Sequence, residues 1–318
     1  MEGRSGRGAT EGRAAAYRPP APLDVGLTLS PLRHGAHDPT VRREGSIWWL
    51  AFRTAAGPAT LRIAPTAAAP AGCAAAVELR AWGEGAERAL AAAPELLGAA
   101  DEADGFDSDR HPVVRRLARR FRGQRLTRSN RVFDALVPAV LEQKVTAEEA
   151  KASWRRLVRR YGEPAPGPAP EGMRVAPAAD GWRGVPSWEW HRAGVTPARS
   201  DTIQRAARVA SGLERTAGSP APDSARALRT VVGIGPWTAA EITQRTHGDP
   251  DSVSVGDLHL CKRVGTALVG RRVDDDGMLE LLEPWRGHRQ RVVRLIEAAG
   301  IGYERHAPRL ARVEHRFR

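Results

Sequence analysis

The stretch from Leu228 to Ala239 reads LRTVVGIGPWTA, and it decides the fold of this chain. We expect one helix to end at the Gly-Ile-Gly turn and a second to begin at Pro236, because glycine tolerates positive φ and proline suits the first helical position. The first N–H groups of the second helix have no intrahelical acceptor and lie at the positive end of its dipole. A nucleic-acid phosphate is therefore expected there, bound directly or through a monovalent cation. Such contacts position a protein on DNA without reading its sequence.

An aspartate, Asp257, follows Gly235 by 22 residues, after the loop HGDPDSVSVG. The turn, the continuation PWTA and this aspartate resemble the helix-hairpin-helix and Gly/Pro-Asp signature of base-excision DNA glycosylases. Within that superfamily they are most similar to the DNA-3-methyladenine glycosylase II family. Two further segments carry the resemblance, which covers residues 105–300: Ala135 to Tyr161, with a Gln-x-Val-Ser/Thr turn, and EPWR at Glu283 to Arg286.

The resemblance implies that Asp257 is the catalytic carboxylate. Cleavage of an N-glycosidic bond leaves oxocarbenium-like charge on the sugar, so the carboxylate either stabilises that charge or activates the attacking water. The alternative is that Asp257 only caps the helix that follows. Relatives that also cut the strand use a lysine two residues after the second glycine of the hairpin, where this chain has Trp237. We therefore expect a monofunctional glycosylase that leaves an abasic site.

The base must leave the duplex before its bond can be attacked, and it then needs stacking surfaces. Trp237 is the first candidate wall, because an indole face attracts a cationic alkylated purine. Trp188, Trp190 and Trp285 are further candidate walls, for which ordinary core packing is the alternative. The pattern departs from the family at Leu258 and Arg294, where the resemblance implies aromatic residues.

The remaining candidate site residues are expected to contact DNA. The hairpin supplies Gly233, Ile234, Gly235 and Thr238. The resemblance implies that the turn Gln143 to Thr146 supplies the group that fills the space left by the extruded base, and Lys144 stands where the family inserts an apolar side chain.

Composition agrees with a polyanionic partner. The 318 residues carry a formal net charge of +12 and have a pI near 10.9. Neutralised phosphates release counterions, so we expect double-stranded DNA as the partner of a monomer. The segment from Arg110 to Arg131 is rich in arginine and has no acidic residue, which favours a DNA-facing surface over a merely solvated one. Abundant arginine, alanine, glycine and proline are also typical of a GC-rich genome.

Other features limit the classes of protein. The N-terminus lacks the apolar stretch of a secretory signal, and no apolar run is long enough to span a membrane, so we expect a cytoplasmic, nucleoid-associated protein. Two cysteines, Cys73 and Cys261, cannot supply a four-thiolate iron–sulfur cluster. No metal site and no cofactor other than a cation at the hairpin is predicted.

The fold class that follows is α+β, with a small antiparallel sheet domain before a mostly helical domain. We expect a disordered arm at residues 1–20, an α+β domain at 21–104, the helix-hairpin-helix glycosylase domain at 105–300 and a basic tail at 301–318. Apolar and turn patterns predict strands in GLTLSPL, SIWWLAFRT, ATLRIAP and AAVELRAWG, followed by a helix in GAERALAAAPELLG.

Helical spacing begins beyond residue 105. The predicted helices are Pro112–Arg122, Arg131–Gln143, Ala147–Tyr161, Ser187–Ala193, Pro197–Arg215, Gly277–Leu282 and His288–Ala298. We expect Thr146 and Glu149 to form a capping box and Asp223 to cap the first hairpin helix. The proline-rich GEPAPGPAPEG is predicted to be a linker.

Two other functions remain open from the sequence. A non-catalytic helix-hairpin-helix module would share the hairpin and the basic surface, although the spacing of Asp257 favours an enzyme. A glycosylase for uracil or oxidised bases would share the whole motif and differ only in its pocket.

Overall fold

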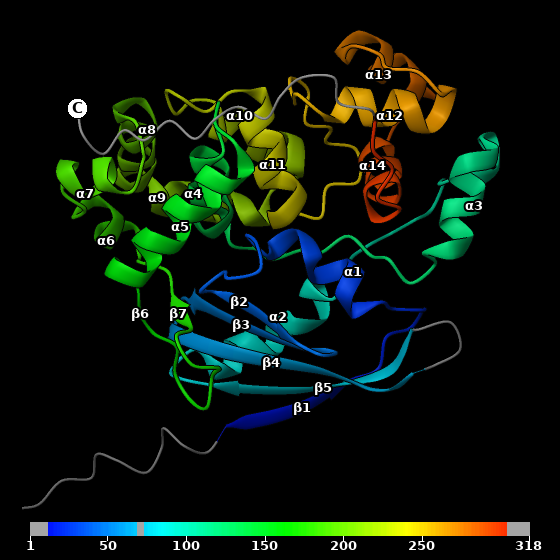
Figure 1. The fold of residues 1–318 in the computed structure, drawn as a ribbon. Coiled ribbons are helices and arrows are strands. Elements are labelled where there is room, and N and C mark those ends of the chain that lie inside the picture. Colours follow the sequence, from blue (N-terminus) through cyan, green and yellow to red (C-terminus); the bar gives the residue numbers. More distant parts are fainter. Residues whose placement is uncertain (1–11, 69–72, 304–318) are drawn as a thin grey trace, which may run out of the picture.

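The computed structural model describes residues 12–68 and 73–303, and Figure 1 shows one sheet layer beneath a larger group of helices. The sheet is antiparallel, with strand order β1-β5-β4-β3-β2. Its strands are β1 (Arg13–Tyr17), β2 (Val41–Glu44), β3 (Ile47–Thr54), β4 (Gly57–Ala68) and β5 (Ala74–Trp82). The α+β fold expected from the sequence is confirmed.

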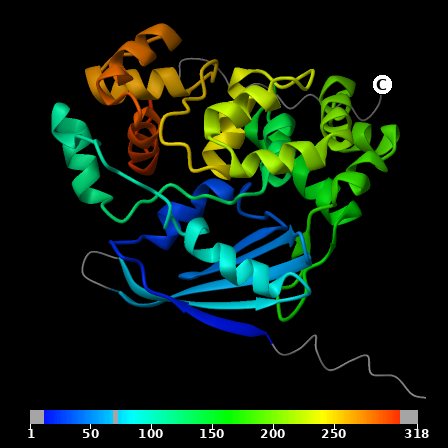
Figure 2. The ribbon, with the colours of Figure 1, turned by 180° about the vertical axis from the view of Figure 1, so that it is seen from behind.

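The two faces of the sheet are buried by different segments. Trp48 lies on the face that packs against helix α2 (Ala86–Leu96), which Figure 2 shows across the sheet. Trp49 points to the opposite face and packs there with Val175 of a small ribbon. The ribbon consists of β6 (Glu163–Pro164) and β7 (Arg174–Val175), so part of the segment predicted to be a linker covers the sheet.

The N-terminal arm, which was expected to be disordered up to residue 20, contains a strand. Residues 13–17 of the expected disordered arm form strand β1, which pairs along β5 from Arg13 opposite Ala81 to Tyr17 opposite Val77. Its alanines carry little strand preference of their own, and the pairing with β5 supplies the order. Residues 1–11 and 304–318, which include most of the expected arm and tail, lie outside the described residues.

The segment GLTLSPL, expected to be a strand, forms helix α1 (Val25–Leu29) and the short helix η1 (Ser30–Leu32). The carboxylate of Asp24 accepts a hydrogen bond from the Leu27 N–H at 2.9 Å and caps the helix. Val25 and Leu29 are then buried on one face, because residues four apart lie above each other on a helix. In Figure 1, α1 lies between the sheet and the helical layer.

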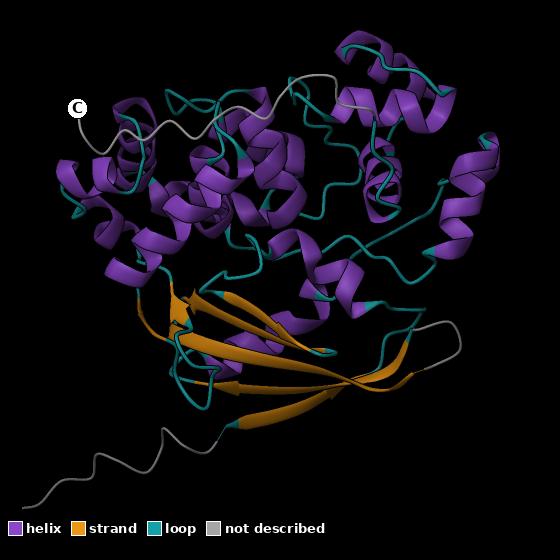
Figure 3. Ribbon diagram, viewed as in Figure 1, coloured by secondary structure: helices purple, strands orange, loops and turns teal. Residues whose placement is uncertain are grey.

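The helices of the upper layer form two groups with separate apolar cores (Figure 3). The larger group contains α4 (Val132–Leu141), α5 (Ala147–Tyr161), α6 (Ala179–Arg183), α7 (Ser187–Arg192), α8 (Pro197–Arg208), α9 (Ala210–Arg215), η4 (Thr216–Gly218), α10 (Ala221–Leu228) and α11 (Pro236–Thr246). The smaller group contains η3 (Ser108–Arg110), α3 (Pro112–Arg120), α12 (Leu260–Val269), α13 (Asp275–Leu282), η5 (Glu283–Trp285) and α14 (Arg289–Ala298).

The helix bounds predicted from the sequence agree with the structure for some of these helices and differ for others. The bounds of α5 and its capping box between Thr146 and Glu149 are confirmed. The single helix expected from Pro197 to Arg215 is two helices, α8 and α9, separated at Val209. The prediction that Asp223 caps the first hairpin helix was wrong. Helix α10 begins at Ala221, so Asp223 lies in its first turn, where it pairs with Arg226.

Candidate active site

The hairpin joins α10 to α11 as the sequence predicts. Gly233 has φ +100°, a conformation that favours glycine, and a Cβ there would lie 2.0 Å from the Thr202 hydroxyl oxygen. Gly235 has φ −92° and is extended, so only Gly233 needs to be glycine for its backbone. Pro236 takes the first position of α11, which leaves the N-terminal N–H groups of that helix without intrahelical acceptors.

Two neighbouring elements hold the hairpin in place. The Gln143 side chain donates hydrogen bonds to the Gly233 carbonyl at 3.0 Å and to the Thr238 hydroxyl at 2.9 Å. The Arg205 guanidinium, on α8, donates to the Val232 carbonyl at 3.1 Å. Gln143 thus acts on the hairpin, and the adjacent Lys144 is exposed at φ +53°.

Not every hairpin residue is turned toward solvent. The Ile234 side chain is buried in the larger helical core, and its N–H donates to the Val231 carbonyl at 3.0 Å. Thr238 is also buried, with its hydroxyl bonded to Gln143. The side chains of these two residues are therefore engaged within the protein, and a contact with DNA through their backbone groups stays a prediction.

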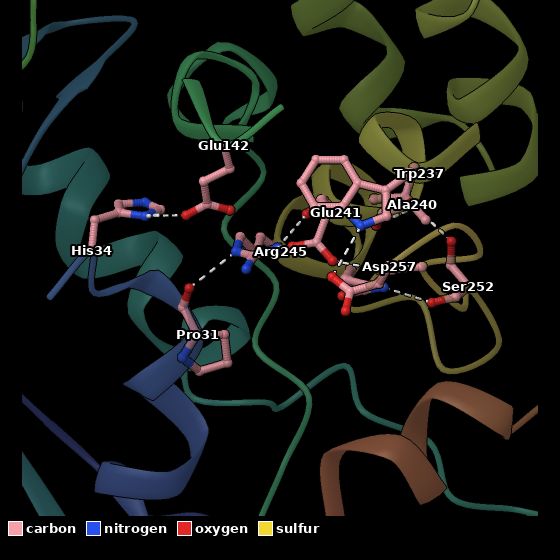
Figure 4. Close-up of polar contacts among 12 residues, drawn as sticks. Pro31, His34, Glu142, Trp237, Ala240, Glu241, Arg245, Ser252 and Asp257 are labelled. Carbon is pink, nitrogen blue, oxygen red and sulfur yellow. Dashed lines mark hydrogen bonds and ion pairs between the residues drawn. The ribbon is translucent and has the colours of Figure 1, made fainter. Parts of the chain in front are cut away.

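Asp257 and Trp237 lie side by side, as Figure 4 shows. One carboxylate oxygen, Oδ1, accepts hydrogen bonds from the His259 N–H at 2.8 Å and the Leu260 N–H at 2.9 Å. The other, Oδ2, accepts from the Trp237 indole Nε1 at 3.4 Å. The N-cap residue of α12 is His259, and Asp257 adds a capping contact to its N–H and to that of Leu260, which leaves the second carboxylate oxygen beside Trp237.

The other three candidate tryptophans lie elsewhere. Trp188 is 65% exposed on α7, toward one end of the helical layer in Figure 1. Trp190 is 1% exposed: it stacks on Trp182, and its indole donates to the Val185 carbonyl at 3.1 Å. Trp285 is 4% exposed and donates to the Asp107 carbonyl at 2.8 Å. Trp190 and Trp285 are core residues, so the prediction that they stack on a base was wrong.

A chain of charged groups beside the Asp257 and Trp237 pair was not predicted. Glu241 lies one turn after Trp237 on α11, and its carboxylate pairs with the Arg245 guanidinium at 2.7 Å. Arg245 also donates to the Pro31 carbonyl, in η1, at 3.0 Å. The spacing of Glu241 and Arg245 was a signal for this pair, but the sequence does not show that Pro31 lies next to them.

Further charges face Arg245 from α4 and the N-terminal layer. His34 and Glu142 approach to 3.8 Å, as Figure 4 shows. Burial acts to raise the pKa of Glu142, but the interactions with His34, Arg245 and Lys151 together lower it. Burial likewise acts to lower the pKa of Arg245, whereas the charges of Glu241 and Glu142 raise it above its ordinary value. Arg245 thus remains a cation among carboxylates.

The two departures from the family pattern are also visible. Leu258, beside the aspartate, is 67% exposed. Arg294, on α14, pairs with Glu297 at 2.8 Å and donates to the Ser30 hydroxyl at 3.3 Å. Arg294 thus contacts the N-terminal layer, where the family resemblance implied an aromatic pocket residue.

Over the described ranges, no group of three or more His, Cys, Asp and Glu side chains is arranged to hold a metal ion. None of the helices in that same part of the chain is both long and apolar enough to cross a membrane.

Comparison with known proteins places this site in a known fold. The chain has a TM-score of 0.73 to a 3-methyladenine DNA glycosylase from Archaeoglobus fulgidus, at 17% identity over 89% of this chain and 97% of that one. It has a TM-score of 0.66 to an 8-oxoguanine glycosylase/lyase from Clostridium acetobutylicum in complex with double-stranded DNA, at 12% identity over 91% and 97%. The fold is thus that of the helix-hairpin-helix DNA glycosylases.

Sequence comparison finds similarity over part of the chain to curated DNA repair proteins. Over 170 residues the chain is 32% identical to the probable bifunctional transcriptional activator/DNA repair enzyme AlkA of two Mycobacterium tuberculosis strains. The match covers 50% of this chain and 31% of those proteins, so the chain spans about a third of the length of the curated relatives it matches. No family model matches the chain. The similarities in sequence and fold support its assignment to the DNA glycosylases, in agreement with the resemblance found in its motifs.

Proposed function

We propose that this protein is a monofunctional DNA glycosylase that hydrolyses the N-glycosidic bond of alkylated bases in double-stranded DNA. The observation that carries the proposal is the pairing of Asp257 with Trp237 beside the hairpin. It places a carboxylate and an indole at one site, which are the two groups that the reaction requires: one for the sugar and one for the base. Similarity to a 3-methyladenine DNA glycosylase supports an alkylated base as the substrate, and similarity to probable DNA repair enzymes supports a role in DNA repair.

In the proposed reaction, water adds across the bond between the sugar C1′ and the base. A cationic alkylated purine leaves with the electron pair of that bond as a neutral base, the water oxygen bonds to C1′, and one water proton passes to solvent, which leaves an abasic site. Asp257 Oδ2 would face the sugar, because Oδ1 is held by the N–H groups of His259 and Leu260 at the start of α12. Electrostatic stabilisation of the sugar cation and activation of the water remain two roles for this oxygen.

The proposal of a monofunctional enzyme rests on the lysines. Schiff-base chemistry needs an amine at the sugar, and the chain has no lysine between Lys151 and Lys262. Lys262 follows Asp257 by five residues, and its ammonium lies 5.8 Å from the centre of the Tyr303 ring. We therefore expect no covalent intermediate to be trapped by borohydride.

We propose that DNA meets the hairpin at the N-terminus of α11 and at the exposed Lys144. Helix N-termini accept phosphates, directly or through a monovalent cation, and an ammonium adds a phosphate contact while its stem can enter the space left by the base. Trp188 is exposed but lies on α7, outside this surface. With DNA as its substrate, we place the protein at the nucleoid of the cytoplasm, acting as a monomer.

The test compares the wild-type protein with Asp257→Asn on methylated duplex DNA. Asparagine caps helices about as well as aspartate, so the variant should keep its fold and bind DNA but release no methylated purine. The control is Asp180→Asn, which alters an 89% exposed carboxylate on α6 and should release base at the wild-type rate. Release by Asp257→Asn at the wild-type rate would contradict the proposal.

A panel of single-lesion duplexes then separates the other functions. Alkali-labile sites only in methylated DNA support the assignment to alkylated bases. Activity only on uracil or an oxidised base would move the protein to another branch of the same fold. Binding without cleavage of any lesion would identify a non-catalytic DNA-binding module.

A further inference from the structure

Asp257 depends on a loop whose position is set by contacts with α11. This loop, residues 252–257, is the part of the connection between α11 and α12 that ends at the aspartate. The central residue of the loop is Ser254, which is 4% exposed. Its carbonyl accepts a hydrogen bond from the Asp257 N–H at 3.3 Å. A displacement of Ser254 would therefore move the backbone of Asp257 directly.

The Ser254 hydroxyl has one donor and one acceptor fixed around it. It donates to a carboxylate oxygen of Glu241 and accepts from the Gln244 side-chain amide at 2.9 Å. The same amide donates to the Ser252 carbonyl at 2.7 Å. A hydroxyl held between a carboxylate and an amide has a single favourable orientation, so these bonds fix the loop as well as bury it.

Glu241 is in turn held from the opposite side. Its second carboxylate oxygen pairs with Arg245 at 2.7 Å, and Arg245 is anchored to the Pro31 carbonyl of the N-terminal layer at 3.0 Å. The side chains of Glu241 and Arg245 are 14% and 18% exposed, so the pair is largely shielded from water. Figure 4 shows this pair beside Trp237 and Asp257.

We propose that Glu241 and Ser254 are positioning residues that set the place of the Asp257 carboxylate relative to Trp237. The claim rests on the proposed function, in which Asp257 is the catalytic residue. Neither residue is expected to touch DNA, and both act through the backbone of the loop. A small misplacement of a catalytic group can lower the rate as much as about a hundredfold, so the effect should appear in the chemical step and not in DNA binding.

The experiment measures base release under single-turnover conditions, with enzyme in excess of a methylated duplex, for Glu241→Gln and Ser254→Ala. Each variant should release base at least about tenfold more slowly, while its Kd for a duplex with an abasic-site analogue stays within about twofold of wild type. Ser254→Ala removes only a hydroxyl group, so it provides the test if Glu241→Gln, which leaves Arg245 without its carboxylate, fails to fold.

The matched control is Glu189→Gln on α7. Glu189 is also a shielded glutamate, 11% exposed at its side chain, and it is paired with Arg192 at 3.2 Å. Figure 1 shows α7 well away from α11. This variant should release base at the wild-type rate, which separates an effect on Asp257 from the general cost of breaking an ion pair.

A second readout does not require activity. The indole N–H of Trp237, which contacts Asp257 Oδ2, gives one resonance in a ¹H–¹⁵N spectrum, and Trp237→Phe identifies it. We expect this resonance to move in Ser254→Ala and to stay in place in Glu189→Gln.

The outcomes distinguish the two proposals. If the wild-type protein releases base and both positioning variants match its rate within about twofold, the positioning claim is wrong and the proposed function stands. If the wild-type protein releases no base from any lesion duplex, the proposed function has failed. In that case the Trp237 indole resonance alone tests the positioning claim, and a resonance that does not move in Ser254→Ala refutes it.

Discussion

Replacing Gly233 with alanine tests whether the hairpin depends on a glycine at that one position. Gly233 has φ +100°, and for a residue with a Cβ such a left-handed conformation costs roughly 1–2 kcal/mol. The added Cβ would also lie 2.0 Å from the hydroxyl oxygen of Thr202, which must then move. Overpacking of this kind costs about 1–3 kcal/mol. We expect Gly233→Ala to lower the free energy of unfolding by roughly 2–5 kcal/mol.

Thr202 cannot simply rotate away. It is 1% exposed, and its hydroxyl donates to the Ala198 carbonyl at 2.8 Å and accepts from Arg205 at 3.1 Å. Arg205 in turn holds the Val232 carbonyl in the hairpin. Moving Thr202 would therefore disturb a second contact to the same turn.

The assay is urea unfolding of the wild-type protein and three variants. Gly235→Ala is the control, because this glycine has φ −92° and a Cβ added to it would have no atom within 4 Å, so the stability of this variant should stay within about 0.5 kcal/mol of wild type. Adding Thr202→Ala to Gly233→Ala should recover the steric part of the loss and leave the backbone part. The reasoning is refuted if Gly233→Ala is as stable as Gly235→Ala.

Two further predictions concern residues outside the site. Asp38 is 1% exposed and accepts hydrogen bonds from the His34 N–H, from the N–H and hydroxyl of Thr40 and from the Trp154 indole. In a urea titration, Asp38→Ala should therefore lower the free energy of unfolding by at least about 4 kcal/mol. A loss below about 1 kcal/mol would contradict this expectation. Burial lowers the pKa of His247, whose ring Nδ1 is buried without a hydrogen-bond partner among the described residues. The unfolded chain therefore binds this proton more readily, and stability should fall as the pH drops below about 6.5. His247→Gln should reduce the difference in unfolding free energy between about pH 7.5 and pH 5.5, and an unchanged difference would exclude His247 as its source.

The parts of the fold that the sequence predicted are those set by neighbouring residues. The Gly-Ile-Gly-Pro turn and the capping box of Thr146 and Glu149 each involve contacts only a few residues apart. The strand expected at GLTLSPL failed because its apolar residues fit either period, and the side chain of Asp24 decided for a helix. Strand β1 was missed because its order comes from pairing with β5, more than sixty residues later in the chain.

In the candidate site, too, the sequence predicted the residues that belong to a local motif but not the contacts between distant segments. Asp257 and Trp237 were predicted from motif spacing, and the structure brings them together. The sequence alone could not separate an exposed tryptophan from a buried one, so Trp190 and Trp285 were assigned to a pocket although they belong to the core. The contacts of Arg245 with Pro31 join residues 214 positions apart, and no local pattern indicates such a contact.

The two interpretations of Asp257 that the sequence left open prove to be compatible in the structure. The capping contact uses Oδ1, which the N–H groups of His259 and Leu260 hold at the start of α12, and Oδ2 then lies beside Trp237. Removing the side chain with alanine would lose the cap, worth about 0.5–2 kcal/mol, together with any catalytic oxygen. Asparagine keeps the cap and changes only the charge. Loss of base release by Asp257→Asn, with fold and DNA binding retained, therefore assigns the effect to the negative charge and not to the helix end that it stabilises.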